Sequence, residues 1–434
     1  MVRNSVEPTA MRGFLACLGA IALACAAVPA VASAAPGIAY GLTDDAWLAN
    51  GPGTTDDRVT TLEGLGVQVV RFTVNWDEVA PTEPAAPEDP QDPAYDWSKP
   101  NDVLNALRSH GIDVVLQLDG APSWSNGGKP PNYLPTRAAS FGAFATAVAH
   151  EYPWIRKFQI WNEPNQARWL RPTSAPLYVT RLLNPAYTAI HAATAGAKVA
   201  GGGTAPRGST GGVSPLAWIA AMHRAHARLD VYAHNPYPLD PKRETPLHAP
   251  PCGTCTTVTM ATLSRLERLV ARDFPRARIW LTEYGYQSNP PDRILGVSPA
   301  LQARYVGEGA YAAYTAPRVD LLIHFLYRDE PTLARFQSGL VTLRNTPKPA
   351  LAAFELPLAE IARSGTTTSL WGQLRAPDVG TDAVLERRIG STWNTFAHIG
   401  VSGRGFFRWR GTLARGTIVR VRAGGLAGAS LTIT

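Results

Sequence analysis

The sequence predicts an α/β fold, a (β/α)8 TIM barrel followed by a small C-terminal antiparallel β-sandwich. Eight short apolar runs alternate with helix-like stretches between residues 37 and 326, and this alternation is typical of parallel βαβ units. Eight such units fit a closed barrel better than an open sheet, and no G-x-G-x-x-G turn opens the first helix. After residue 368 the pattern changes to short strands separated by glycine-rich turns, which indicates the sandwich.

The expected elements follow in order. The barrel strands are predicted at 37–42, 67–75, 112–118, 157–162, 198–202, 229–233, 278–282 and 319–326. Helices are predicted at 102–110, 138–151, 185–196, 215–227, 260–272 and 299–315, and a last one opens at Pro347 and runs to about Glu360. We therefore expect a barrel domain over 35–361, a linker at 362–368 and the sandwich over 369–434.

The first residues predict export. An apolar run at 13–28 follows a basic start and precedes Ala32-Ser33-Ala34, the A-x-A pattern of a signal-peptide cleavage site. We expect residues 1–34 to be a signal peptide and the mature protein to be secreted or extracytoplasmic. A lipoprotein anchor on Cys25 is the alternative. No later segment is apolar enough to predict a membrane span.

Two cysteines remain after the predicted signal, Cys252 and Cys255 in a proline-rich loop. In an exported protein such a pair is most simply a disulfide. A redox pair belongs at a strand-to-helix turn, and a zinc site would need two further ligands. The sequence therefore predicts a disulfide and requires no metal or cofactor.

The net charge of +7 resides in the tail, because residues 362–434 contain ten arginines against two aspartates and one glutamate. Arginines alternate with apolar residues, as in Arg420-Val421-Arg422, which fits a solvated sheet face. A patch that binds acidic cell-wall polymers is the alternative. The tail has no lysine and no recognition motif, so we expect no nucleic-acid partner.

Two glutamates end predicted strands. Glu163 lies in Trp161-Asn162-Glu163-Pro164-Asn165, where the proline forces the chain to turn at the strand end. Glu283 follows the strand 278–282. A lone glutamate after a strand is often only a surface residue. In a barrel of this kind, however, strand ends on the carboxyl side carry the chemistry, and two carboxyls are what glycoside hydrolysis needs.

These segments resemble the clan A glycoside hydrolases over about residues 36–361, most closely family 39 and next family 5. The likeness rests on 160–165 and 281–285, and it includes Val70-Arg71-Phe72 and His234-Asn235-Pro236-Tyr237. The resemblance implies a retaining hydrolase that cleaves an oligo- or polysaccharide through a covalent glycosyl-enzyme. A retaining pair predicts carboxyl groups roughly 5–5.5 Å apart.

The resemblance also implies roles. Glu163 would be the general acid/base and Glu283 the nucleophile, with Asn162 reaching the sugar 2-hydroxyl. Tyr237 would donate a hydrogen bond to the nucleophile, and Arg71 would keep it ionised through its opposite charge. A structural ion pair is the alternative for Arg71.

Further candidates for substrate binding are His234, His324 and Trp124. His234 is either an orienting residue or one whose hydrogen bonds are satisfied within the protein, and Trp124 could stack on a sugar face. The eighth strand lacks the tryptophan of many clan A members, so His324 or Tyr327 is expected in its place. Trp161 shares strand parity with Glu163 and is predicted to face the barrel interior.

Two other functions stay open on the sequence. One is a catalytically weak carbohydrate-binding or cell-surface protein on a hydrolase scaffold, which the altered eighth strand and the basic tail would suit. The other is a transglycosylase, which would use the same carboxyl pair. The sequence gives neither the sugar nor the linkage.

Overall fold

The computed structural model describes residues 35, 37–250, 252, 255–377, 380 and 382–434. The predicted signal peptide, residues 1–34, lies outside the described residues. In the described part of the chain, no helix has the length and apolar character needed to cross a membrane.

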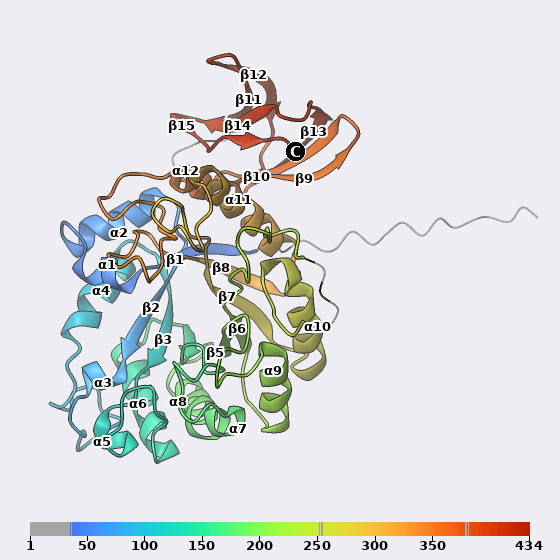
Figure 1. Ribbon diagram of the computed structural model, residues 1–434. Helices are drawn as coiled ribbons and strands as arrows, with labels where there is room; N and C mark the ends of the chain where they lie inside the picture. Colours follow the sequence, from blue (N-terminus) through green and yellow to red (C-terminus); the bar gives the residue numbers. More distant parts are fainter. Residues whose placement is uncertain (1–34, 36, 251, 253–254, 378–379, 381) are drawn as a thin grey trace, which may run out of the picture. The chain divides into compact units, whose positions relative to one another are not determined.

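Eight parallel strands close into a barrel in sequence order, with β1 hydrogen-bonded to both β2 and β8 (Figure 1). The strands are β1 (Ala39–Thr43), β2 (Val69–Asn75), β3 (Asp113–Asp119), β4 (Lys157–Ile160), β5 (Lys198–Thr204), β6 (Val231–His234), β7 (Arg278–Tyr284) and β8 (Val319–Phe325). Each strand overlaps one predicted apolar run. The predicted barrel is therefore confirmed.

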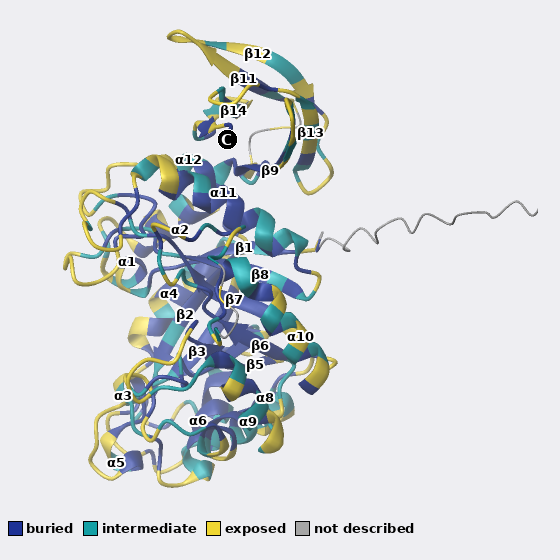
Figure 2. Ribbon diagram, turned by 45° about the vertical axis from the view of Figure 1, so that its right-hand side comes forward, coloured by how far each residue is buried: buried dark blue, intermediate teal, exposed yellow. Residues whose placement is uncertain are grey.

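The helices surround the barrel, with buried residues toward the strands and exposed residues outward (Figure 2). They are α1 (Asp45–Asn50), α2 (Thr55–Gly64), α3 (Trp76–Val79), α4 (Ser98–Ser109), α5 (Ser123–Asn126), α6 (Ala138–Glu151), α7 (Ala175–Tyr178), α8 (Asn184–Ala193), α9 (Pro215–Arg224), α10 (Leu263–Asp273), α11 (Pro299–Thr315) and α12 (Pro349–Glu355). A π-helical segment (Val179–Leu183) and a 3₁₀ turn (Met260–Thr262) complete them.

The barrel interior has two layers, an apolar core and a polar layer that lies closer to the carboxyl ends of the strands. Inward-facing apolar residues of the strands form one cluster: Val69, Val115, Ala200, Val231, Ala233, Trp280, Leu321 and Ile323. Strand β1 approaches its neighbours so closely that a Cβ on Gly41 would lie 2.0 Å from the Val69 carbonyl oxygen. The polar layer toward the carboxyl ends of the strands contains Arg71, Gln117 and Gln159.

The C-terminal part consists of two antiparallel sheets, as predicted. One has the order β13-β10-β9 and the other β12-β11-β14-β15, with β16 paired to β14. Their strands are β9 (Leu358–Ser364), β10 (Thr367–Gln373), β11 (Ala383–Ile389), β12 (Thr392–Ile399), β13 (Phe406–Thr412), β14 (Ile418–Ala423), β15 (Leu426–Ala427) and β16 (Leu431–Thr432).

The predicted linker at 362–368 is not a linker in the structure. It contains the end of β9, a tight turn and the start of β10, and the two strands pair antiparallel. Gly365 has a φ of 60° in this turn, so the small polar residues that suggested a linker serve a hairpin instead. The sandwich therefore begins at Leu358, before the predicted boundary.

Aromatic side chains connect the sandwich to the barrel. Trp371 of β10 is fully buried, and its ring centroid lies 5.5 Å from that of Tyr311 and 5.3 Å from that of Tyr314, both on α11. The Arg375 guanidinium lies 3.7 Å from the ring centroid of Tyr40 in β1. The two parts thus share a buried interface.

Candidate active site

Glu283 near the end of β7 accepts one hydrogen bond on each carboxyl oxygen. Arg71 Nη2 donates to Oε1 at 2.7 Å, and the Tyr237 hydroxyl donates to Oε2 at 2.8 Å. Glu283 is only 7% exposed, so these two donors fix the orientation of its carboxylate. The structure thus places Arg71 and Tyr237 against Glu283, as the family resemblance implied.

The Arg71 guanidinium is held by Gln117, which is itself held by Gln159, and the sequence analysis singled out neither glutamine. Arg71 Nη1 donates to Gln117 Oε1 at 2.7 Å, and Gln159 Nε2 donates to the same oxygen at 2.9 Å. Burial lowers the pKa of Arg71, but the charges of Glu283 and Asp45 outweigh burial and raise the pKa overall. The guanidinium is therefore a fixed positive charge beneath Glu283.

Glu163 is held at the end of β4 by its backbone. The strand stops at Ile160, and Trp161 and Glu163 have φ of 69° and 38°. The Glu163 N–H donates to the Gly203 carbonyl at 2.9 Å. Gly203 has a φ of 50°, and a Cβ there would lie 3.0 Å from the Trp161 carbonyl oxygen, so the close approach of the two chains requires glycine.

The Glu163 carboxyl has the properties of a general acid. Burial, together with the charge of Glu283, raises its pKa to about 7, while a hydrogen bond from Asn235 acts in the opposite direction. Asn235 Nδ2 donates to Glu163 Oε1 at 3.2 Å, and Asn235 Oδ1 accepts from the Thr282 hydroxyl at 2.9 Å. Asn235 thus connects Glu163 with the strand that carries Glu283. A carboxyl with this pKa retains a proton near neutrality.

Trp161 does not face the barrel interior, and that prediction is wrong. The side chain is fully buried in the outer core, with its ring centroid 6.2 Å from that of Phe141 on α6. Its Nε1 donates to the Trp169 carbonyl at 2.8 Å. The positive φ at Trp161 interrupts the alternation of the strand, so strand parity no longer relates it to Glu163.

Neither histidine is placed to bind a substrate, so both expectations are corrected. His234 is fully buried, with its ring nitrogens 2.9 Å from Thr204 Oγ1 and 3.0 Å from the Val258 carbonyl oxygen. His324 lies on the outward face of β8, where its Nε2 is 3.1 Å from the Ser338 carbonyl oxygen. Burial lowers the pKa of each to about 4. Both histidines are therefore neutral near pH 7, and their hydrogen bonds are made within the protein.

Phe325 takes the place for which His324 or Tyr327 was expected. It shares the inward face of β8 with Ile323, and its ring centroid lies 6.1 Å from that of Tyr237 and 4.9 Å from that of Phe336. Tyr327 instead packs on Trp47. The floor beside Glu283 is therefore formed by phenylalanines, so the prediction for this position is wrong.

Two tryptophans lie near the ends of β3 and β4. Trp124 is half-buried, with Nε1 bonded to the Ala80 carbonyl at 2.8 Å and its ring edge-on to Trp76. Its contact with a sugar stays a prediction. Trp169 is 37% exposed and is one of the side chains that act on the Glu163 carboxyl. Of the two, Trp169 is the one with a direct effect on Glu163.

Two further carboxyls belong to this site and were missed. Asp119 ends β3, and its Oδ2 accepts from the Asn162 N–H at 3.1 Å and from Gln117 Nε2 at 3.3 Å. Burial raises the pKa of Asp119 to about 7 and that of Asp45 to about 6. Asp119 could have been found by the rule that identified the glutamates, because it too ends a barrel strand.

Asn162 contributes an open acceptor. Its Oδ1 is buried without a hydrogen-bond partner among the described residues, whereas its backbone N–H is held by Asp119. A buried oxygen left in this state is suited to a hydroxyl donor from a ligand. Among the described residues, no group of 3 or more His, Cys, Asp or Glu side chains is arranged to hold a metal ion.

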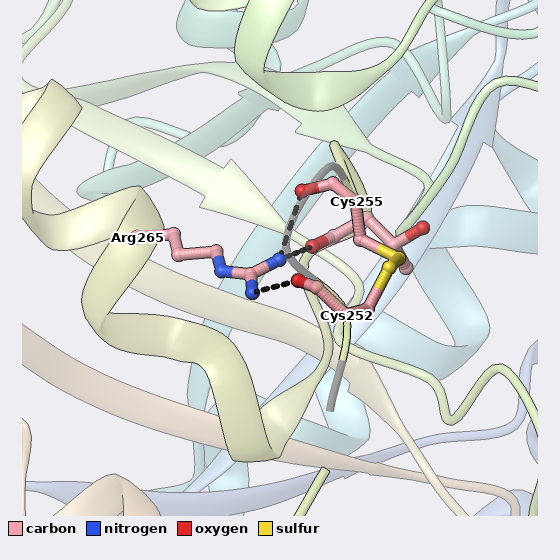
Figure 3. The surroundings of a disulfide bond; sticks show 4 residues. Cys252, Cys255 and Arg265 are labelled. Atoms are coloured by element: carbon pink, nitrogen blue, oxygen red, sulfur yellow. Dashed lines mark hydrogen bonds between the residues drawn. A yellow bond between two sulfur atoms is a disulfide. The ribbon is translucent and has the colours of Figure 1, made fainter. Parts of the chain in front are cut away.

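Cys252 and Cys255 form a disulfide, as predicted, in the segment between β6 and α10 (Figure 3). Arg265 of α10 holds the same segment by donating Nη1 to the Cys255 carbonyl at 2.9 Å and Nη2 to the Cys252 carbonyl at 3.4 Å. Arg265 and the disulfide therefore both hold Cys252 and Cys255 in this segment.

The model of the cellulase family (glycosyl hydrolase family 5) matches residues 32–218. This stretch contains Arg71, Asn162 and Glu163, and the match supports glycoside hydrolase activity. A search of curated protein sequences gives no significant match.

Solved structures of glycosidases resemble the chain at low identity. An FMN-binding β-glucuronidase from Facaelibacterium prausnitzii L2-6 is 13% identical, with a TM-score of 0.48, over 93% of this chain and 58% of its own. β-Glucuronidase 2 from Bacteroides uniformis is 12% identical, with a TM-score of 0.49, over 92% of this chain and 46% of its own. A β-glucosidase from Thermotoga maritima is 12% identical, with a TM-score of 0.47, over 73% of this chain and 96% of its own. This chain thus spans about half the length of the two glucuronidases, and the fold assignment rests on its own strand order.

Proposed function

We propose that this chain is a secreted retaining glycoside hydrolase that cleaves O-glycosidic bonds of an oligo- or polysaccharide. The observation that carries the proposal is the contrast between the two glutamates. Glu163 is a partly buried acid with a pKa raised to about 7, and Glu283 is oriented by Arg71 and Tyr237. One environment favours a proton donor and the other an anionic nucleophile, and this division of roles is what glycoside hydrolysis uses.

The reaction would proceed in two displacements. In the first, a Glu283 oxygen attacks the anomeric carbon while Glu163 gives its proton to the departing glycosidic oxygen, so that one C–O bond forms and one breaks. In the second, Glu163 takes a proton from water, the water oxygen attacks the same carbon, and Glu283 leaves as carboxylate. Arg71 and Tyr237 hold Glu283 in position through both steps. A sugar acceptor in place of water would give transglycosylation.

Two narrower parts of this proposal rest on the sequence. Export rests on the signal-like residues 1–34. The likeness to family 39 rests on the motifs around Glu163 and Glu283, whereas the family model that matches is that of family 5. Both families belong to clan A, so the proposal of a clan A hydrolase is compatible with either one.

Release of reducing ends from a panel of plant and microbial polysaccharides tests the activity. We expect the wild-type chain to release reducing ends from at least one polymer and Glu163→Gln to lose most of this rate. Proton NMR of the first product should show the anomer of the substrate. Inertness of the wild type across the panel would favour the carbohydrate-binding alternative, and an inverted first product would contradict the retaining mechanism.

We also propose that the basic sheet of the sandwich contacts acidic cell-wall polymers. Arg420 and Arg422 share the single carboxylate of Glu386, each at 2.8 Å, which leaves this cluster positive. The Arg420 guanidinium also lies 4.1 Å from the ring centroid of the partly exposed Trp393. Co-sedimentation with polygalacturonate should fall as sodium chloride rises, because salt screens such contacts. Equal binding of Arg420→Gln and wild type would contradict this role.

A further inference from the structure

The loops after the last three barrel strands carry most of the exposed large apolar side chains. Of the nine such side chains in the described part of the chain, six lie within residues 235–250, 285–298 and 326–348. Ile294 is 80% exposed and Leu333 is 62% exposed. Apolar side chains gathered at one end of a barrel indicate a surface that contacts another apolar body. We call this set the apolar rim, and it consists of Leu239, Ile294, Leu295, Leu333, Phe336 and Leu343.

The three loops are connected beside the candidate active site. Lys242 Nζ of the first loop donates to the Arg293 carbonyl of the second at 3.1 Å. The ring centroid of Phe336 in the third loop lies 5.4 Å from that of Tyr237 in the first. The Tyr237 hydroxyl is in turn a donor to Glu283. The apolar rim therefore borders the site that contains the glutamates.

The outward charge of these loops is positive. Their acidic residues are buried or only partly exposed. Asp240, Asp292 and Glu330 each accept a backbone N–H within their own loop, at 3.1, 2.8 and 2.7 Å, and Glu330 also lies 3.5 Å from Arg335. These carboxylates thus shape the loops. The charged side chains that are fully exposed on the three loops are all basic: Lys242, Arg243, Arg293, Arg335 and Arg344.

An anionic lipid bilayer fits this combination better than a sugar chain or a second copy of the protein. Five of the six side chains of the apolar rim are aliphatic, whereas a sugar face stacks on aromatic rings. Two copies that met through the rim would bring the same basic residues together, and like charges across an interface repel. Exposed aliphatic side chains next to arginines, as in Arg293-Ile294 and Leu343-Arg344, suit a lipid surface whose headgroups are anionic.

We propose that the apolar rim is an interfacial docking surface that binds an anionic lipid bilayer. Ile294, Leu295 and Leu333 enter the boundary between headgroups and acyl chains, and Arg293 and Arg335 contact headgroup phosphates. Because the rim borders the glutamates, docking turns the candidate active site toward the membrane. This inference goes beyond the proposed function and does not depend on it.

Co-sedimentation with lipid vesicles tests the proposal. We expect the wild-type chain to bind vesicles of equimolar phosphatidylcholine and phosphatidylglycerol, to bind phosphatidylcholine alone much more weakly, and to be released by sodium chloride. Ile294→Ser should lower the partition coefficient by about tenfold, as for one aliphatic side chain kept out of an apolar phase. The matched control is Ile389→Ser, which removes an isoleucine that is 58% exposed in β11 of the sandwich. It should stay within about twofold of the wild type, because binding follows the apolar area that reaches the lipid.

A second pair of variants separates the apolar rim from the basic sandwich. Arg293→Gln should lower binding to the anionic vesicles by about fivefold, as for one basic residue at such a surface. Arg420→Gln, which removes a sandwich arginine, should leave vesicle binding unchanged. A larger loss in Arg420→Gln than in Arg293→Gln would assign the lipid contact to the sandwich and overturn the proposal.

Other results would also overturn it. They are no binding of the wild type to the anionic vesicles, equal binding to both kinds of vesicle, equal binding of Ile294→Ser and Ile389→Ser, or a dimer in analytical ultracentrifugation that Ile294→Ser dissociates. If Ile294→Ser unfolds below the wild-type temperature, Leu333→Ser replaces it, and unchanged binding by that variant contradicts the proposal. Vesicle binding requires no turnover, so its failure leaves the proposed hydrolase intact, and an inert chain that binds vesicles removes only the hydrolase.

Discussion

The roles proposed for the two glutamates follow from their immediate neighbours. Burial and the charge of Glu283 raise the pKa of Glu163 to about 7, although hydrogen bonds from Asn235 and Trp169 act in the opposite direction. Glu283 instead has a guanidinium and a phenol within 2.8 Å. Two chemically identical side chains therefore lie in environments that suit the two proposed roles.

The raised pKa of Glu163 predicts how the rate depends on pH. Below about pH 7 the acid is protonated and can donate, and above it the proton is lost, so kcat/KM for substrates with poor leaving groups should fall as pH rises through about 7. An activated aryl glycoside needs no protonation and should lack this decline at the glycosylation step. Initial rates between pH 5 and 9 check the difference. A common alkaline limb for both substrate types would contradict the assignment of Glu163.

The Tyr237 hydroxyl is the second hydrogen-bond donor to Glu283, and its removal measures what that bond contributes to the rate. Removing its hydroxyl in Tyr237→Phe should lower kcat by about 10- to 100-fold, because a hydrogen bond to a charged group contributes about 1.5–3 kcal/mol. Tyr327→Phe is the matched control, since that ring packs on Trp47 and, among the described residues, has no recorded hydrogen bond to Glu163 or Glu283. Steady-state kinetics on one aryl glycoside suffice. An unaffected kcat in Tyr237→Phe would show that the bond to Glu283 is not used in the reaction.

At the scale of the element, the strands were predictable and the turns at their ends were not. Apolar runs separated by helix-like stretches located β1 to β8, and strand ends pointed to Glu163 and Glu283. The positive φ at Trp161, which turns that ring outward, has no signature in the strand pattern. The satisfied hydrogen bonds of His234 depend on Thr204 and Val258, which are remote in sequence. Gln117 and Gln159 were missed because glutamine in a strand carries no distinctive signal.

Strand β1 lies so close to β2 and β8 that we expect Gly41 to tolerate no side chain. A Cβ at this position would lie 2.0 Å from the Val69 carbonyl oxygen and 2.6 Å from Ile323 Cδ1. Gly41→Ala should therefore lower the free energy of unfolding by about 2 kcal/mol or more. Gly64→Ala in α2 is the control, because a Cβ there meets nothing within 4 Å. Urea unfolding measures both, and equal stability of the two variants would contradict the close approach of β1.

At the scale of the whole molecule, the sandwich is packed on the barrel through Trp371, Tyr311 and Tyr314. Ending the chain at Arg363 would leave β9 without β10 and expose the two tyrosines. We expect the truncated protein to be insoluble or to unfold at a clearly lower temperature than the full chain, because a buried aromatic interface is lost. A soluble truncated barrel that melts at the full-length temperature would show that the sandwich is an independent domain.

The assignment of roles to Glu163 and Glu283 is tested most directly by azide rescue of the two alanine variants on a β-linked aryl glycoside. Glu163→Ala should still form the glycosyl-enzyme from an activated substrate and, with azide as the second nucleophile, release a β-glycosyl azide. Glu283→Ala cannot form the intermediate, so azide should attack directly and give the α-glycosyl azide. NMR of the products distinguishes the two anomers. The same anomer from both variants, or wild-type turnover by either without azide, would contradict the account.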